Sequence, residues 1–123
     1  MIKNLGVDVI EVDRIKSAVD KWGGVFLQRI FTASEIEYSK KHRFSCEHLA
    51  ARFAAKEAVF KAFGDGNTRF IKWTDIEILN DNNGRPHVFL HGNAKSAIGD
   101  GEVMVSMAHT KRYAVANAAI VKK

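Results

Sequence analysis

The sequence predicts an α+β domain in which an antiparallel sheet packs against one long central helix. Residues 45–63 are good helix formers with no interior Gly or Pro, and Gly64 follows them as a stop. Residues 74–90 and 103–121 each read as two strands around a tight turn, which predicts antiparallel hairpins. The length of 123 residues suffices for a single domain with a real core and leaves no room for a second.

The N-terminal third is predicted to form one strand followed by short helical segments. We expect a strand at 4–10, an amphipathic helix at 11–21, one or two helical turns at 25–30 and a helix at 32–41. The first helix is predicted by the spacing of its apolar residues (Val12, Ile15, Val19, Trp22), and Gly23-Gly24 ends it. Thr32 and Glu35 form a capping box in which Thr32 is the N-cap of the helix that follows.

After the long helix the pattern changes to strands and turns. We expect a loop at 65–68, strands at 74–79 and 86–90 around the turn 81–84, a short helix at 92–98, and strands at 103–109 and 113–121 around 110–112. Asp81-Asn82-Asn83-Gly84 is a strong hairpin turn. Pro86, the only proline, fits the first residue of a strand.

The long helix is predicted to be apolar on two faces. Ser45 is its expected N-cap, and Glu47 lies in its first turn. At about 100° per residue, large apolar side chains share one stripe (Leu49, Phe53, Phe60, Phe63). A second ridge on nearly the opposite side carries alanines (Ala51, Ala55, Ala58, Ala62). A helix of this kind is expected to be enclosed by sheet, another helix or a neighbouring subunit.

Glu57 and Lys61 are the charged pair of interest on this helix. They lie one turn apart, on the strip that also holds Ala50 and Ala54. One interpretation is an ion pair between positions i and i+4, worth roughly 0.2–0.5 kcal/mol. The other is a site in which the alanines leave room for a ligand, and the carboxylate and ammonium hold a hard cation and a phosphate.

Asp8 is the one acid within the predicted strand at 4–10. It is either a strand-end residue that caps the following helix or a functional carboxylate. Gly6 lies two residues before it and allows another segment or a ligand to approach the backbone closely.

The histidines show no metal-ligand spacing. His109 ends a predicted strand and is either a half-exposed residue of a basic turn or part of a site. The others are interpreted as structural or solvent-facing (His42, His48, His87, His91).

Composition narrows the classes of partner and the cell compartment. The net charge of +5 favours an anionic partner or substrate, without choosing between nucleic acid, a phosphorylated cofactor and an acidic protein. The single Cys46 excludes an intramolecular disulfide and a cysteine-rich zinc site, and it is interpreted as a packing residue. With no apolar run long enough for a signal peptide or a membrane span, we expect a cytoplasmic protein that does not act at a membrane.

Three segments together resemble the signature segments of the holo-[acyl-carrier-protein] synthases, the small 4′-phosphopantetheinyl transferases. They are Gly6–Ile15, Arg52–Gly64 and Val105–Thr110. Their order and spacing, the turn Gly84-Arg85-Pro86 and the chain length are similar too, so the resemblance covers nearly the whole chain.

The resemblance implies the fold of that family and the transfer of phosphopantetheine from coenzyme A to a serine of apo acyl carrier protein, in fatty acid biosynthesis. Adenosine 3′,5′-bisphosphate is released, Mg²⁺ is required, and a homotrimer carries its active sites at subunit interfaces. Asp8 and Glu57 would hold the metal and share catalysis with Lys61. The coenzyme A site would include five residues (Lys61, Gly64, Ser106, His109, Thr110). Carrier docking would fall on a basic face (Arg14, Lys21, Arg29).

Elementary chemistry agrees with these roles. Attack on the coenzyme A pyrophosphate places negative charge on its bridging and leaving oxygens, which Mg²⁺ on one or two carboxylates neutralises. Lys61 can place its ammonium on the same phosphates or protonate the departing one. The general base is either Glu57 acting through a metal-bound water or a water alone.

Two other functional classes were considered for this sequence. A basic nucleic-acid-binding module would interleave aromatic and basic residues on an exposed face, whereas most Phe residues here fall on predicted core positions. An inactive structural subunit of a synthase assembly would keep the fold without the metal site, and the presence of Asp8, Glu57 and Lys61 opposes it.

Overall fold

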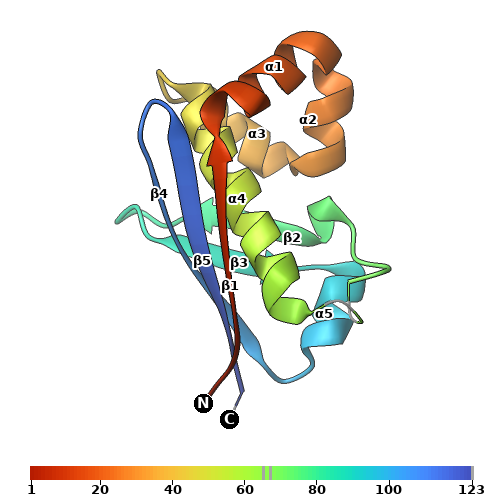
Figure 1. The fold of residues 1–123 in the computed structure, drawn as a ribbon. Coiled ribbons are helices and arrows are strands. Elements are labelled where there is room, and N and C mark those ends of the chain that lie inside the picture. The colour runs from red at the N-terminus through yellow and green to blue at the C-terminus, as the bar shows by residue number, and fades with distance from the viewer. Residues whose placement is uncertain (65, 67, 123) are drawn as a thin grey trace.

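Helix α4 (Ser45–Phe63) runs through the middle of the molecule and contacts strands of two sheets (Figure 1). The computed structural model describes residues 1–64, 66 and 68–122. Along these residues the other elements are β1 (Ile2–Glu11), α1 (Val12–Trp22), α2 (Gly24–Ile30), α3 (Ala33–Lys40), a 3₁₀ turn (Trp73–Asp75), β2 (Ile76–Asn80), β3 (Pro86–Leu90), α5 (Gly92–Ile98), β4 (Glu102–His109) and β5 (Tyr113–Val121).

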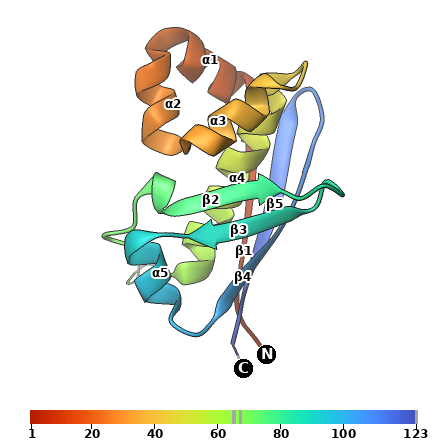
Figure 2. The same cartoon turned by 180° about the vertical axis from the view of Figure 1, so that it is seen from behind.

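The strands form two antiparallel sheets. β1, β5 and β4 pair in that order, with Asp8 opposite Ala116 and Ser106 opposite Asn117. β2 and β3 form a separate hairpin that crosses α4 on its other side (Figure 2). Because β1 pairs with β5, the two ends of the chain lie side by side (Figure 1). The predicted α+β class and both predicted hairpins are confirmed.

The alanine ridge of α4 packs against the three-stranded sheet. All four of its alanines are buried, as predicted (Ala51, Ala55, Ala58, Ala62). At Gly6, β1 lies directly against the helix backbone: an added Cβ would lie 2.0 Å from the carbonyl oxygen of Ala58. Only glycine lets β1 approach the helix backbone this closely.

The opposite stripe of α4 packs against the hairpin side and the 3₁₀ turn. Leu49 and Phe63 are buried, as predicted. Phe53 and Phe60 are half-buried and contact the ring of Trp73, with centroids 5.1 and 5.0 Å away. The prediction that α4 is enclosed on two faces is therefore confirmed.

Local signals gave most element boundaries to within two residues. Thr32 and Glu35 form the predicted capping box: the Thr32 hydroxyl accepts from the Glu35 amide at 3.3 Å, and the Glu35 carboxylate accepts from the Thr32 amide at 2.8 Å. The strand predicted at 74–79 begins only at Ile76, because the preceding residues form the 3₁₀ turn.

One detail of the predictions is wrong, and another lies in part outside the described residues. Ser45 is the first residue of α4 and not its N-cap, which is Phe44, and no side chain among the described residues caps that helix end. Of the loop predicted at 65–68, Asp65 and Asn67 lie outside the described residues. Within the described part of the chain, none of the helices combines the length and hydropathy that a bilayer crossing requires.

Candidate active site

Asp8 of β1 and Lys61 of α4 meet where the strand lies on the helix. Lys61 Nζ donates to Asp8 Oδ1 at 3.0 Å and to the Val7 carbonyl at 3.0 Å. The Lys61 side chain is 54% exposed, whereas that of Asp8 is only 16% exposed. The ammonium is thus held at the mouth of the site while remaining accessible to a ligand.

This contact decides two alternatives that the sequence left open. Among the described residues Lys61 makes its ion pair with Asp8 and none with Glu57, so the simple helix ion pair is wrong. Asp8 lies within β1 and does not cap α1, whose N-cap is Glu11. The functional interpretation of Asp8 is therefore favoured by its position.

Glu57 is the second carboxylate of the site. Burial raises its pKa above the ordinary value, and the negative charge of Asp8 raises the pKa further. Lys61 and Arg14 act in the opposite direction, so both cations also lie within electrostatic reach of Glu57. Two neighbouring acids with unfavourable mutual charge form a pair that a bound cation would stabilise.

The donor set suits a hard divalent ion that keeps much of its own solvent shell. Among the described residues no group of three or more His, Cys, Asp or Glu side chains is arranged to hold a metal. Mg²⁺ is commonly bound by one or two carboxylates, with waters and substrate phosphates completing its coordination. Asp8 and Glu57 therefore fit Mg²⁺ and do not fit a preformed zinc site.

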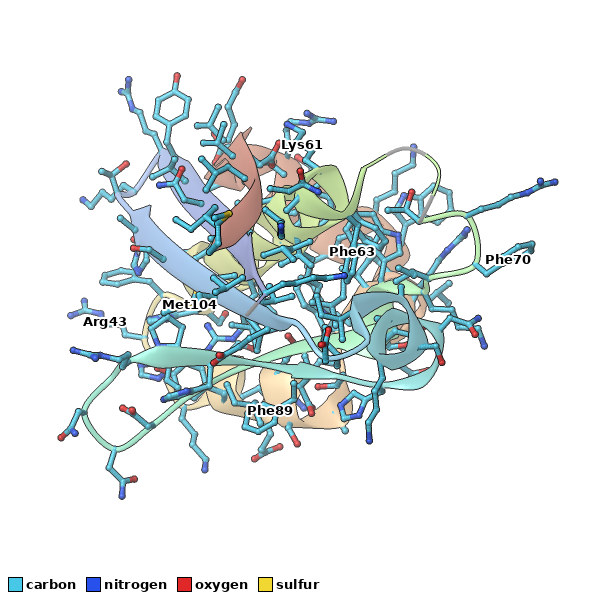
Figure 3. The ribbon with its side chains drawn as sticks, turned by 90° about the horizontal axis from the view of Figure 1, so that it is seen from below. Arg43, Lys61, Phe63, Phe70, Phe89 and Met104 are labelled. Atoms are coloured by element: carbon cyan, nitrogen blue, oxygen red, sulfur yellow. The ribbon has the colours of Figure 1, made fainter. Side chains whose placement is uncertain are left out.

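The open space of the site is not where the sequence suggested. Ala50 and Ala54 were expected to floor a cavity beside the charged pair, yet both are completely buried. Access is instead from the exposed side of Lys61, which lies on the opposite side of the molecule from Phe89 of β3 (Figure 3).

The third predicted segment lies at the end of β4. His109 Nδ1 is 3.1 Å from Glu47 Oε1, and its ring centroid is 5.0 Å from that of His48. Ser106 and Thr110 are exposed. Thr110 Oγ1 also accepts from the amides of Arg112 and Tyr113, so this residue shapes the β4–β5 turn.

The histidines near this segment form a ring cluster that their spacing in the sequence did not predict. The ring centroid of His48 lies 4.1 Å from that of His42 and 5.0 Å from that of His109, so His48 contacts both rings. Burial and the two neighbouring imidazoles lower the pKa of His48 to about 4, so it is neutral near pH 7. No local pattern could show this cluster, because His109 is 62 residues from its partner Glu47.

A single chain keeps the two halves of the predicted site apart. Glu47 contacts His109, whereas Glu57 follows Glu47 by ten residues on α4, a rise of about 15 Å. Gly64 follows the last turn of α4, at the Lys61 end. Lys61, Asp8 and Glu57 therefore form one group, and His109 lies apart from it; Ser106 and Thr110, on β4 and in the turn after it, are assigned with His109 to a second group by their place in the chain.

The predicted docking residues lie on the exposed surface of α1 and α2, and Arg14 is the one of them that the structure shows near the first group. Arg14 is close enough to Glu57 to lower its pKa. Lys21 Nζ lies 5.0 Å from the ring centroid of Trp22, itself 58% exposed. Arg29 is exposed in the last turn of α2. A cavity of about 520 Å³ between β3, α5 and β4 includes none of these residues or of the two groups above.

Comparison with known proteins places this geometry in a family. Residues 4–118 match the model of the 4′-phosphopantetheinyl transferase superfamily. The chain is 47% identical over 120 residues to the holo-[acyl-carrier-protein] synthase of Ruminiclostridium cellulolyticum, covering 94% of this chain and 90% of that protein.

Solved structures give the same result for the fold. The holo-[acyl-carrier-protein] synthase of Neisseria meningitidis superposes with a TM-score of 0.87 at 30% identity, covering 99% of this chain and 100% of that chain. The Bacillus anthracis str. Ames holo-(acyl-carrier-protein) synthase, solved in complex with CoA, superposes with a TM-score of 0.83 at 34% identity, covering 100% of this chain and 99% of that chain.

Proposed function

Because this chain belongs to the holo-[acyl-carrier-protein] synthases of the 4′-phosphopantetheinyl transferase superfamily, we propose that Asp8, Glu57 and Lys61 are the catalytic residues of its reaction. That reaction transfers phosphopantetheine from coenzyme A to apo acyl carrier protein, a transferase step of fatty acid biosynthesis. The observation that carries the assignment is the meeting of Asp8 with Lys61, 53 residues away in sequence, beside Glu57.

The residues divide the chemistry among them. The carrier serine oxygen bonds to the phosphorus that bears pantetheine, and the bond from that phosphorus to the bridging oxygen breaks, so adenosine 3′,5′-bisphosphate leaves. Asp8 and Glu57 would hold Mg²⁺, which supplies neutralisation of the pyrophosphate charge. The exposed ammonium of Lys61 turns from Asp8 to the phosphates as negative charge develops there. The serine proton passes through a water to Glu57, or to a water alone.

The test of this function is transfer itself, measured by intact mass of the carrier. Incubation of apo acyl carrier protein with this protein, coenzyme A and Mg²⁺ should add one phosphopantetheine to the carrier. EDTA should abolish the increment and Mg²⁺ should restore it, because two carboxylates without a cation oppose the charge of the substrate. The Asp8→Asn variant, which lacks one of the two proposed metal ligands, is the matched control and should show little transfer even when Mg²⁺ is present. Full transfer after exhaustive chelation would exclude Asp8 and Glu57 as metal ligands.

The separation of the two groups supports a homotrimer in which each active site is shared between subunits. The outer face of the three-stranded sheet exposes large apolar side chains (Leu5, Val7, Val9, Met104, Val115). Exposed apolar surface of this kind marks an association site. A neighbouring copy on this face would bring its Ser106, His109 and Thr110 to the coenzyme A bound at Lys61 and Gly64.

A mixing experiment tests the shared site. Asp8→Asn and His109→Ala subunits, each of low activity alone, should regain activity when refolded together, because some interfaces then contain neither substitution. Random assembly at equal amounts predicts about a quarter of the parent activity. Light scattering gives the oligomer mass. A monomer, or a mixture with only the average activity of the two variants, would exclude the shared site.

Carrier docking is assigned to Arg14, Lys21 and Arg29 on α1 and α2. Opposite charges at a transient interface chiefly raise the association rate, and salt screens them over a Debye length of about 10 Å at 0.1 M and about 3 Å at 1 M. NaCl should therefore raise the KM for an acidic carrier more than the KM for coenzyme A. Arg14→Glu should show the same carrier defect at low salt, with Tm and coenzyme A binding retained. Normal carrier use by both Arg14→Glu and the double variant Lys21→Glu, Arg29→Glu would place docking elsewhere.

A cytoplasmic location completes the proposal. Cys46 is a free, half-buried thiol, consistent with a reducing compartment. Fractionation of cells that express the tagged full chain would test it directly.

A further inference from the structure

Lys56, the residue before Glu57, lies in the interior of the molecule with an acid as its partner. Both side chains of the Lys56–Glu35 pair are completely buried, and Lys56 Nζ is 2.7 Å from Glu35 Oε1. Lys56 Nζ also donates to the carbonyls of Ile30 and Trp73, at 2.7 and 3.1 Å. The ammonium therefore has three acceptors. Burial, with a smaller contribution from the charge of Arg52, lowers its pKa, while Glu35 opposes that effect.

The acceptors of Lys56 come from three separate segments. Ile30 ends α2, Glu35 lies in the first turn of α3, and Trp73 opens the 3₁₀ turn. The other oxygen of Glu35 accepts from the Ile78 amide of β2 at 2.9 Å. One lysine thus joins α4 to the helices, the 3₁₀ turn and, through Glu35, the hairpin.

This connection is one of the contacts that restrain the rotation of α4 about its own axis. Successive residues of an α-helix point about 100° apart, so the direction of the Lys56 side chain sets that of Glu57. On the other side of the helix, Ala58 and Ala62 rest on Gly6 with no space to spare. A rotation of α4 by a few degrees would therefore either disturb the Lys56–Glu35 pair or displace β1, the strand that bears Asp8.

We propose that Lys56 is a positioning residue, which through its buried pair with Glu35 fixes the direction of Glu57 relative to Asp8 and thereby sets the affinity of the two carboxylates for a divalent cation. The inference rests on the proposed function, since it assigns a cause to the geometry of the same metal site. Groups that orient metal ligands typically affect metal affinity by about 10–100-fold. A buried pair retained only for stability would be replaceable by neutral residues of similar volume, often with no net loss.

The experiment measures Mn²⁺ binding to the full chain, with coenzyme A present, by the electron paramagnetic resonance signal of free Mn²⁺. Lys56→Met should raise the Kd for Mn²⁺ by about tenfold or more. Ile120→Ala is the matched control: this buried residue lies on β5 opposite Asn4, away from Asp8, and should lower Tm with little change in Mn²⁺ affinity. Equal Mn²⁺ affinity in parent and Lys56→Met would overturn the proposal, as would a parallel loss in Ile120→Ala.

A second variant covers the case in which Lys56→Met does not fold. Glu35→Gln, Lys56→Met removes the unpaired buried carboxylate and should recover Tm relative to the single variant. Its Mn²⁺ affinity should remain weak. Recovery of Mn²⁺ affinity together with Tm would show that the pair acts through stability alone. If the parent protein does not bind Mn²⁺, or if the Asp8→Asn variant binds Mn²⁺ as tightly as the parent does, the metal site itself is refuted. The role proposed for Lys56 is then refuted as well.

Discussion

Replacement of Lys61 by methionine should lower the transfer rate by about 10²–10³-fold while the protein remains folded. The ammonium is an accessible cation of the site, where it donates to Asp8 and to the Val7 carbonyl. Methionine keeps much of the side-chain volume and removes the charge that would stabilise the leaving phosphate. The lysine of this ion pair is more than half exposed, and surface pairs are worth roughly 0–1 kcal/mol, so the stability of the fold should change little.

Paired measurements of turnover and Tm distinguish the roles of Lys61. Lys40→Met is the matched control, since Lys40 is an exposed lysine on α3 outside the site, and we expect it to retain parent activity. A Lys61→Met variant with parent turnover and parent Tm would leave Lys61 as a surface ion-pair partner of Asp8 and nothing more.

Replacement of Gly6 by alanine should damage both the fold and the site. The added Cβ would lie 2.0 Å from the Ala58 carbonyl oxygen and 2.9 Å from the Ala62 amide nitrogen, and both atoms belong to the backbone of α4. Backbone cannot move aside as a flexible side chain does, so β1 must shift away from the helix. Overpacking of this kind costs about 1–3 kcal/mol or more. Because β1 bears Asp8, the activity should fall by more than the loss of folded protein accounts for.

The control for Gly6→Ala is Gly24→Ala. Gly24 is the first residue of α2, and an added Cβ there would meet no atom of the described residues within 4 Å beyond its chain neighbours and its own helix. Alanine at this position should leave Tm unchanged or raise it slightly, because it reduces the entropy of the unfolded chain. A Gly6→Ala protein with parent Tm and parent Mg²⁺ dependence would show that β1 can retreat without moving Asp8.

The sequence predicted secondary structure well because its strongest signals are local. The capping box at Thr32, the hairpin turn before Gly84 and the two apolar faces of α4 each depend on residues a few positions apart. The wrong N-cap prediction for α4 is also local: Ser45 was expected at that position, but Phe44 occupies it without a side-chain hydrogen bond. The turn at Trp73 was missed because two aromatic side chains of α4 pack on it, and that packing overrides strand propensity.

Interpretation of the charged residues needed more than their spacing. The charge of +5 allowed a nucleic-acid-binding module, and the family match excludes that class in favour of the transferase. Asp8, Glu57 and Lys61 were selected from their apolar surroundings and from the motif resemblance, and their proximity is now seen in the fold. Their roles, with those of Gly64, Ser106, His109 and Thr110, stay predictions until the variants are measured.

By itself the sequence determined the α+β class, the two apolar faces of the long helix and the family, because periodicity and motifs are recorded in neighbouring residues. Only the tertiary structure decided that Lys61 pairs with Asp8 and not with Glu57, that Lys56 is buried with Glu35, and that His109 lies with Glu47, away from the carboxylates. Each of these contacts joins residues 21 to 62 positions apart. The partner of a charge is chosen by which backbones can approach, and here that depends on the missing side chain of Gly6.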